Sequence, residues 1–471
     1  MGADVLALLA LGSVALFVVG LKRLSRIRTA RSGNALMAAG MLLAVVITLV
    51  EQGLVDYRWI AGGLVVGAAG GVAIVLRAKA TAMPEIVARF NGFGGAASAL
   101  VALSLFWLNV VERTGAGTAA DELGATSATT LVLSVLIGAT TFSGSIIAEL
   151  KLRGVIKGQP SIPLRGAVMG LLVLGGLALG GVAVLTIDDP TLAAALVLGL
   201  LAVSLVAGLI LVTPIGGADM PVVISLLNSL SGLAAAATGF ALANNLLIIA
   251  GTIVGAAGLI LTQIMCAAMN RSLLNVMVGG YGTDAPSGDA AEYESIVSAD
   301  AEEAAMVLEA AQSVIIVPGY GLAAARAQNA AYDVAKALEA RGATVRFAIH
   351  PVAGRMPGHM NVVLAEAEVP YELLYEMDEI NQDFSQTDAV IVVGANDVVN
   401  PAANTEPGSP IAGMPILEVG KARRVFVIKR SLAPGYAGIK NDLFERDHTV
   451  MLFGDAKDVL ESLATELSEN A

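Results

Sequence analysis

The sequence predicts an α-helical membrane bundle of about nine helices, followed by an α/β domain built on a parallel sheet. Hydrophobic residues make up 56% of the 471 residues and charged residues only 14%, against roughly 25% charged residues in soluble domains. Apolar stretches of membrane-spanning length recur up to residue 268. After residue 312, short β-branched runs alternate with helical segments, which is typical of a parallel α/β sheet.

The apolar stretches are each close to the ~20 residues that a helix needs to cross the hydrocarbon core. They cover residues 4–21, 34–50, 59–77, 85–110, 129–148, 166–187, 191–212, 221–242 and 245–268. The fourth stretch is long, and the sequence does not decide whether Gly92–Gly95 interrupt its helix. The 52 glycines suit a bundle in which helices approach closely.

Basic residues indicate the orientation of these helices. The first apolar run, Val5–Gly20, is followed rather than preceded by a basic cluster, as in a retained helix with its N-terminus outside. With that orientation the inner loops hold twelve basic residues and the outer loops two. The inner ones are Lys22, Arg23, Arg26, Arg28, Arg31, Arg77, Lys79, Lys151, Arg153, Lys157, Arg165 and Arg271; the outer ones are Arg58 and Arg113. This positive-inside pattern places the C-terminal region in the cytoplasm.

We expect three parts: a membrane part over residues 1–275, a linker over 276–312 and the α/β domain over 313–471. The net charge of −12 argues against nucleic acid as a partner. The single cysteine, Cys266, excludes an internal disulfide framework and a cysteine-based metal site, so we expect no metal. The predicted strands are Ser313–Val317, Thr344–Ile349, Ala389–Val393, Arg424–Ile428 and Thr449–Phe453, and the predicted helices are Ala301–Ala311, Leu322–Arg341 and Ala456–Leu467.

The strongest chemical motif joins the first strand to the next helix. Gly319-Tyr320-Gly321 begins a G-x-G-x-x-A pattern, in which glycines permit a tight turn and close approach to a pyrophosphate at a helix N-terminus. This context predicts a Rossmann-like dinucleotide site. A plain glycine turn is the alternative reading.

Two basic positions favour NADP over NAD. The second strand ends in Ile349–Arg355, with no acid for the ribose hydroxyls and one arginine. Lys429-Arg430-Ser431 follows a later strand, and such cations suit a 2′-phosphate. Solvated strand ends would explain the same residues. Gly394–Asp397 and Gly435–Gly438 also look like ligand loops, with Tyr436 as a lid, although Asp397 could cap a helix and Tyr436 could simply pack.

At this level of detail the chain resembles the β subunit of proton-translocating NAD(P) transhydrogenases, over nearly its whole length. The matching stretches are 318–322, 350–361, 376–381, 394–402, 410–419, 429–431, 435–438 and 453–457 in the α/β domain, and 216–221, 227–229 and 269–272 in the membrane part. The resemblance implies reversible, Re/Si-specific hydride transfer between NAD(H) and NADP(H), coupled to proton translocation. The membrane part would then conduct protons, and the α/β domain would bind NADP(H).

The resemblance also implies roles for residues. Lys429, Arg430 and Ser431 would hold the 2′-phosphate, Tyr436 would belong to a lid, and Asp397, the catalytic candidate, would lie near the nicotinamide. The expected cofactor-binding residues are Gly319, Tyr320, Gly321, Val352, Ala353, Gly354, Arg355, Met356, Pro357, Gly394, Ala395, Asn396, Asp397, Val398, Gly413, Met414, Lys429, Arg430, Ser431, Leu432, Ala433, Pro434, Gly435, Tyr436, Asp455 and Ala456.

Hydride transfer between two nicotinamides requires two nucleotide sites, and this chain carries one fingerprint in a plausible setting. We therefore expect an alpha subunit that carries the NAD(H)-binding domain. The resemblance further implies a dimer of complexes and the lipid bilayer of a bacterial inner (cytoplasmic) membrane.

A proton route needs polar groups within the bundle, and Asn91, Asp219 and Asn228 are the candidates. Helix–helix adhesion is the alternative for both asparagines. Position 91 is a histidine in some family members, and an asparagine does not take up a proton near neutral pH. The titrating group is then on the partner, on Asp219 or on bound water.

Two other functions stay open. A nucleotide-gated channel would need a selectivity filter or paired broken helices, and neither is evident. A membrane-anchored dehydrogenase would need a substrate domain, for which residues 313–471 leave little room.

Overall fold

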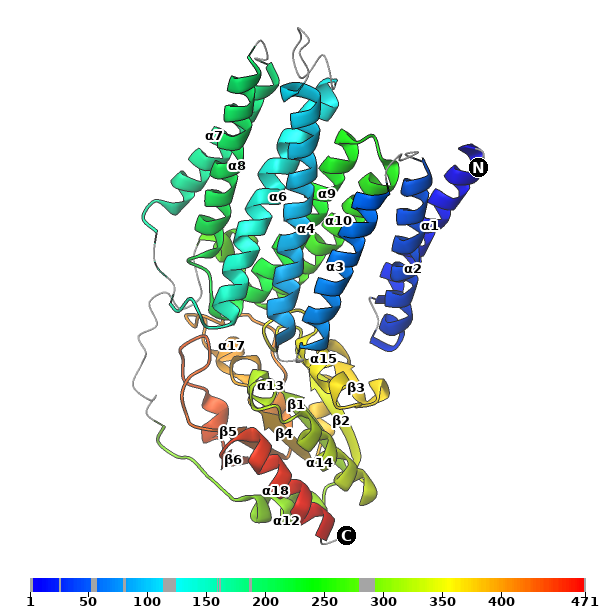
Figure 1. The fold of residues 1–471 in the computed structure, drawn as a ribbon. Coiled ribbons are helices and arrows are strands. Elements are labelled where there is room, and N and C mark those ends of the chain that lie inside the picture. The colour runs from blue at the N-terminus through cyan, green and yellow to red at the C-terminus, as the bar shows by residue number, and fades with distance from the viewer. Residues whose placement is uncertain are drawn as a thin grey trace. The chain divides into compact units, whose positions relative to one another are not determined.

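The computed structural model describes residues 3–24, 27–51, 57–78, 82–112, 124–158, 160, 162–185, 189–278 and 293–469 (Figure 1). The chain divides into two compact units. The first comprises Met1–Pro214 and Val223–Leu261, and the second Ile215–Val222 and Thr262–Ala471. The predicted boundaries at residues 275 and 312 remain predictions, and residues 279–292 of the predicted linker lie outside the described residues.

The described residues include nine helices that are long and apolar enough to cross a membrane, which confirms the predicted bundle and identifies a multi-pass membrane protein. They are α1 (Ala3–Leu24), α2 (Ile27–Glu51), α3 (Arg58–Leu76), α4 (Met83–Phe106), α6 (Ala125–Leu152), α7 (Arg165–Leu185), α8 (Pro190–Val212), α9 (Met220–Ala241) and α10 (Asn245–Ala268), followed by the short α11 (Leu273–Val278). Helix α4 runs unbroken through Gly92–Gly95, so the break left open there does not occur.

Glycines let the membrane helices approach one another closely. A Cβ atom on Gly95 of α4 would lie 2.6 Å from the Gly138 carbonyl oxygen of α6. Gly232 of α9 faces Gly251 and Gly255 of α10 in the same way, at 2.8 Å from the Gly251 carbonyl oxygen. Small residues at such crossings increase van der Waals contact between backbones. Close backbone packing therefore explains part of the high glycine content.

The second unit contains a six-stranded sheet in the order β3-β2-β1-β4-β5-β6, and every neighbouring pair is parallel. Its strands are β1 (Ser313–Pro318), β2 (Thr344–Ile349), β3 (Leu374–Glu376), β4 (Ala389–Val393), β5 (Arg424–Lys429) and β6 (Thr449–Phe453). The five predicted strands are all present, and the Rossmann-like class is confirmed. Strand β3 was not predicted, because its three residues are too short to show a periodic pattern.

After α11, the α-helices of this unit are α12 (Ala301–Glu309), α13 (Tyr320–Ala325), α14 (Gln328–Ala340), α15 (His359–Glu366), α16 (Met377–Ile380), α17 (Ala402–Thr405) and α18 (Ala456–Glu469). The prediction of one helix over Leu322–Arg341 is wrong. Arg326 adopts the left-handed conformation (φ 55°) and ends α13 before α14 begins. Helix α18 packs against both α12 and α14 (Figure 1).

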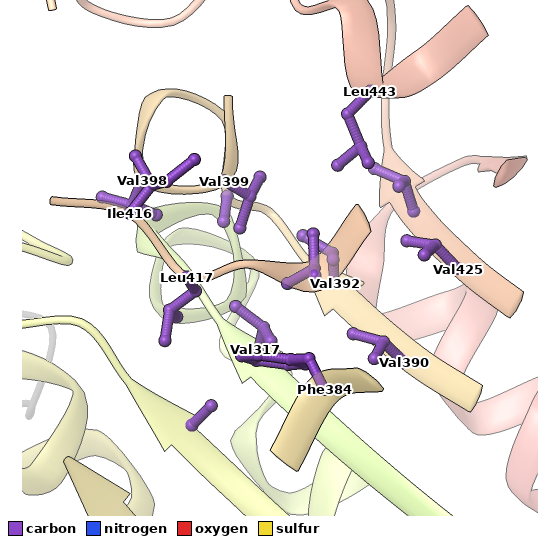
Figure 2. Close-up of a cluster of buried hydrophobic side chains, with 14 of the residues drawn as sticks. Val317, Phe384, Val390, Val392, Val398, Val399, Ile416, Leu417, Val425 and Leu443 are labelled. Atoms are coloured by element: carbon purple, nitrogen blue, oxygen red, sulfur yellow. The ribbon is translucent and has the colours of Figure 1, made fainter. Parts of the chain in front are cut away.

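The core on one face of the sheet consists of apolar side chains from alternate strand positions and from the loops that cover them. Val317, Val390, Val392 and Val425 project from β1, β4 and β5 toward Phe384, Val398, Val399, Ile416, Leu417 and Leu443 (Figure 2). All are buried. Except for Phe384, which precedes β4, the covering residues lie in segments that follow β4 and β5. The core therefore holds in place backbone that forms the site described next.

Candidate functional site

A cavity of about 440 Å³ opens at the carboxyl ends of the strands. Its wall comes from the segments that follow β1 (Gly319–Gly321), β2 (Val352–Gly354), β4 (Gly394–Val398) and β5 (Arg430–Ser431). The strand order reverses direction between β1 and β4, and ligands of open α/β sheets bind at such switch points. Fold and cavity therefore agree on where a ligand would bind.

The glycines of the predicted fingerprint pack against the loop after β4. A Cβ atom on Gly321 would lie 2.6 Å from the Gly394 Cα, and one on Gly319 would lie 2.5 Å from the Ala395 Cα. Gly394 itself has a φ of +64°, a conformation that favours glycine. The two loops thus meet backbone to backbone, and the Gly319 and Gly321 N–H groups donate to the Val393 and Gly394 carbonyls at 2.8 and 2.9 Å.

The end of β2 contributes a cation and no carboxylate to this region. The Arg355 guanidinium lies 4.3 Å from the centre of the Tyr320 ring. The Arg355 backbone N–H donates to Nδ1 of His359 at 2.9 Å. Burial, and then the charge of Arg355, lower the pKa of His359 to about 4. His359 is therefore neutral near pH 7, and Arg355 supplies the positive charge.

Lys429 ends β5 and points its ammonium into a polar corner. Nζ donates to the Ala433 carbonyl at 2.8 Å. With its amide oxygen turned inward, Asn396 accepts from Nζ of Lys429 at 3.0 Å and from the Gly435 N–H at 2.7 Å. Burial lowers the pKa of Lys429 to about 8, and the nearby Asp397 charge partly offsets this effect. The ammonium is thus poorly hydrated and close to the cavity.

Asp397 joins the loop after β4 to the segment Gly435–Gly438. Its Oδ2 accepts from the Ala437 N–H at 3.0 Å. Its Oδ1 is buried with no hydrogen-bond partner among the described residues. Burial raises the pKa of the carboxyl, and Lys429 acts in the opposite direction. A buried oxygen of this kind is free to accept a hydrogen bond from a ligand.

The outer wall of the cavity is exposed. Arg430 and Ser431 are exposed at its edge, and Tyr436 is 41% exposed. The charge of Arg430 and the hydroxyl of Ser431 suit a phosphate group. The exposed ring of Tyr436 offers a flat surface to a planar ring of a ligand.

Most of the predicted binding residues line the cavity. They are Gly319, Tyr320, Gly321, Val352, Ala353, Gly354, Gly394, Ala395, Asn396, Asp397, Val398, Lys429, Arg430, Ser431, Ala433, Pro434, Gly435, Tyr436, Asp455 and Ala456. Arg355, Met356, Pro357, Gly413, Met414 and Leu432 are not part of its wall. The wall also includes Ala324, Ala325, Ile428 and Gly454, which were not predicted. Ala324 is the last residue of the fingerprint and Ala325 follows it, Ile428 lies one residue before the end of β5, and Gly454 follows β6. Position in the motif and at the strand ends was therefore the available signal.

Of the six predicted binding residues outside the cavity wall, Met356 and Met414 are buried, and Leu432 packs against the hydrophobic core. The Gly413 N–H donates to the Ala403 carbonyl at 2.8 Å. Arg355 borders the cavity through Tyr320. Whether any of them binds a ligand remains a prediction.

Two predicted proton-route residues lie in the first unit. Asn91 of α4 is buried, and its Nδ2 donates to the Ile224 carbonyl of α9 at 3.3 Å. Asn228 lies in the middle of α9 and is half-buried. The contact of Asn91 ties α4 to α9, which is compatible with helix–helix adhesion as well as with a polar route.

Asp219 lies just before α9 in the second unit and is fully buried. Nη1 of Arg271 lies 2.8 Å from one of its carboxylate oxygens and 2.9 Å from the other. This ion pair connects the start of α9 to the segment after α10. Asp219 could be predicted from the sequence but its pairing with Arg271 could not, because Arg271 lies 52 positions further along the chain.

The fold and the cavity define a class: a multi-pass membrane protein with a Rossmann-like domain whose cavity lies at the switch point of a parallel sheet. The sequence profile of the NAD(P) transhydrogenase beta subunit matches residues 6–466. The NAD(P) transhydrogenase subunit beta of Rhodospirillum rubrum is 47% identical over 457 residues, which cover 96% of this chain and 97% of the relative. A sequence of the same name from a defined strain of that organism matches equally. The chain belongs to the NAD(P) transhydrogenase beta subunit family.

Proposed function

We propose that this chain binds NADP(H) in the cavity and takes part in hydride transfer between NAD(H) and NADP(H), coupled to proton translocation. Family membership supports the enzyme class. One structural observation supports the choice of NADP(H). Lys429, Arg430 and Ser431 gather at a cavity whose β2 end carries Arg355 and no acid. Cations and a hydroxyl group at the end of β5 suit the charge of a 2′-phosphate, which NAD(H) lacks.

The residues of the cavity fit such a ligand. The fingerprint turn brings the start of the short helix α13 to the cavity wall, where the Gly319 and Gly321 N–H groups donate to the Val393 and Gly394 carbonyls rather than to a ligand. Lys429, Arg430 and Ser431 would hold the 2′-phosphate, and Tyr436 would cover the ligand. The unpartnered Oδ1 of Asp397 would accept a hydrogen bond near the nicotinamide end. When bound, the nicotinamide supplies the hydride chemistry.

In this function the protein positions the two nicotinamide rings and shields them from water. It does not donate protons to them. Hydride transfer needs two rings held in contact and water kept away. No general base is required of Asp397, whose expected role is to bind and orient. The Re/Si stereochemistry would follow from which face of the nicotinamide the cavity leaves open to the second nucleotide.

The second nucleotide would come from an alpha subunit that carries the NAD(H)-binding domain. The relatives are named as beta subunits, which supports a partner of this kind. We further propose a dimer of such complexes in a bacterial inner membrane, with the N-terminus outside and the α/β domain in the cytoplasm. The basic residues of the predicted inner loops support this orientation.

Coupling to protons would act through the affinity for NADP+ relative to NADPH. One charge moving through 100 mV releases about 2.3 kcal/mol. At ~1.4 kcal/mol per tenfold, this energy shifts an equilibrium roughly 40-fold. We propose that Asn91, Asp219 and Asn228 belong to the proton route. Because Asp219 is paired with Arg271, the pair rather than an isolated carboxyl would respond to protonation.

The first test measures binding of NADPH and NADH to the purified full chain. We expect NADPH to bind more tightly, and equal or reversed preference would refute the choice of cofactor.

The second test reconstitutes the chain with its alpha subunit in vesicles and follows reduction of an NAD+ analogue by NADPH. An imposed pH gradient should change the rate and the final balance. Ion flux without reduction would favour a gated channel instead. Reduction of a small substrate without the alpha subunit would favour a membrane-anchored dehydrogenase.

A further inference from the structure

The segment Tyr293–Ala299, here called the strap, is the first described part of the chain after α11, and it runs along the outer edge of β6. The Met451 N–H donates to the Val297 carbonyl at 2.8 Å, and the Ala299 N–H donates to the Met451 carbonyl at 3.1 Å. Ser298 and Met451 form a parallel bridge. Ile296 packs against the hydrophobic core of the sheet. The strap is therefore a separate, short attachment at the sheet edge.

Tyr293 anchors the leading end of the strap. Its ring stacks on Phe444 with centres 6.0 Å apart and planes at 30°. Its hydroxyl accepts a hydrogen bond from the Asn441 N–H at 3.2 Å. Nζ of Lys440 lies 5.2 Å from the ring centre and pairs with Glu445 at 2.6 Å. Tyr293 thus contacts the loop between β5 and β6 through its ring and through its hydroxyl.

The hydroxyl contact leads to the cavity through Asn441. This side chain is fully buried, and its Oδ1 accepts from the Leu443 N–H at 3.1 Å. Its Nδ2 donates to the Asn396 backbone carbonyl at 3.2 Å. With its amide oxygen turned toward the cavity, Asn396 in turn accepts from Nζ of Lys429 and from the Gly435 N–H. Three successive hydrogen bonds, through Asn441 and Asn396, therefore connect Tyr293 to Lys429 and likewise to Gly435.

The ring contact leads to the same lysine by a second path. Phe444 is fully buried. Nζ of Lys429 lies 5.1 Å from the centre of its ring, within the range of a cation–π interaction. Phe444 thus contacts both the strap tyrosine and the cavity lysine. If Tyr293 left, the Phe444 side chain would lose a stacking partner and water would gain access beside Lys429.

We propose that Tyr293 is a positioning residue for the nucleotide site, which through Asn441 and Phe444 holds Lys429 and the Gly435 end of the lid in place. This inference rests on the proposed function, because it assigns the effect to the grip on the 2′-phosphate. Tyr293 lines no part of the cavity wall. Its effect would therefore be indirect, and it would discriminate between nucleotides with and without the phosphate.

The strap gives the chain a way to change nucleotide affinity from outside the cavity. It is joined covalently, through residues 279–292, to α11 and the membrane helices that precede it. A state in which the strap is docked and a state in which it is released would differ in affinity for the phosphorylated nucleotide. Such a difference is what a two-state coupling mechanism requires.

The test uses the purified full chain and measures affinity for NADPH and for NADH in three variants. Tyr293→Phe keeps the ring and removes the hydroxyl, Tyr293→Leu removes both contacts, and Val297→Ala is a control in the same strap, where the side chain is 52% exposed. Loss of one hydrogen bond should weaken NADPH binding about three- to tenfold in Tyr293→Phe. Tyr293→Leu should weaken it further. NADH binding in both, and NADPH binding in the control, should stay near wild type.

A pH series separates positioning from a general loss of structure. Removing the cover over Phe444 should raise the pKa of Lys429 toward its ordinary value. The pH above which NADPH affinity declines should therefore move upward in Tyr293→Leu. Equal weakening of NADPH and NADH with an unchanged pH profile would overturn the inference, and so would wild-type affinities in both tyrosine variants. If the wild-type chain shows no preference for NADPH, the proposed function fails, and this inference falls with it.

Discussion

Lys429 gives the cavity a charge that depends on pH near the physiological range. Burial lowers its pKa to about 8 in the free protein. A bound 2′-phosphate favours the charged ammonium and raises that pKa, so binding takes up a proton in the interval between the two values. NADPH affinity should therefore be full below pH 8 and fall as the pH rises above it. Isothermal titration in buffers of different ionisation enthalpy measures this proton uptake.

Lys429→Arg tests the origin of this pH dependence. An arginine stays charged over the whole range. The variant should bind NADPH with little pH dependence between pH 7 and about 9, since a guanidinium keeps its proton throughout this range. NADH lacks the 2′-phosphate and serves as the matched ligand control. A decline in NADPH affinity that is unchanged in Lys429→Arg would assign the titration to another group.

Gly394 is a residue at which even one methyl group should disturb the site. Its φ of +64° disfavours a side chain, and a Cβ atom would meet Gly321 and Leu322. We expect Gly394→Ala to destabilise the α/β domain by about 1–3 kcal/mol and to weaken NADPH binding. Gly408→Ala is the control, because a Cβ atom there meets nothing within 4 Å. Thermal unfolding of the two variants, followed by domain-specific fluorescence, should separate them, and equal stability would contradict the predicted clash.

Helices and strands with long apolar patterns could be predicted from the sequence, whereas interruptions set by single residues could not. Length and hydropathy identified the membrane helices, and β-branched runs identified five strands. Arg326 breaks the predicted helix in a left-handed conformation, although arginine is a good helix former. Strand β3 forms because Leu374–Glu376 pair with β2, a tertiary contact with no local signature.

The candidate site shows the same division. Residues at the carboxyl ends of β1, β4 and β5 could be predicted, because motif and strand position coincide there. Tyr293, Asn441 and Phe444 could not, since no motif marks them and their contacts join segments far apart in the sequence. Asp219 was predicted without Arg271 for the same reason. Positions that act through a neighbour become visible only in three dimensions.

Helices α4 and α6 are joined by an ion pair within the bundle. Nε of Arg89 donates to Glu149 at 3.0 Å, and Nη2 contacts the other carboxylate oxygen. The Glu149 side chain is only 7% exposed. Glu149→Leu should remove the hydrogen-bonded anion beside Arg89 and lower stability by about 1–3 kcal/mol, less than for a fully buried pair, because the Arg89 side chain is 26% exposed. A thermal-shift assay of the full chain in detergent measures the loss.

Two further variants distinguish the pair from simple packing. Arg89→Leu combined with Glu149→Leu removes both charges of the pair and should recover much of the lost stability, because neither charge is left without the other. Arg153→Met should have little effect, since this more exposed arginine contacts Glu149 only at 3.5 Å. A double variant no more stable than Glu149→Leu would show that size rather than charge matters there.

At the scale of the whole molecule, the chain combines a bundle with few charges and an α/β domain with most of the acids. The proposed chemistry needs no proton from the cavity, so a proton-coupled enzyme has to convert charge movement into a change of nucleotide affinity. The strap is one place where such a change could enter the α/β domain. The ion pair between Asp219 and Arg271, which links the segments around α9 and α10, is a candidate for the other end of the conversion.

This role of the pair yields a prediction for the complete complex in vesicles. Asp219→Asn removes the charge partner of Arg271 and weakens a buried interaction of about 3–5 kcal/mol. Because Asp219 lies outside the cavity wall, NADPH affinity should change little. The response of hydride exchange to an imposed pH gradient should fall at least roughly tenfold, the factor that corresponds to ~1.4 kcal/mol. Arg271→Lys keeps the charge and should retain part of the response. An Asp219→Asn complex that responds to the gradient like the wild type would exclude the pair from the proton route, whereas loss of NADPH binding in this variant would show that Asp219 supports the fold of the α/β domain instead.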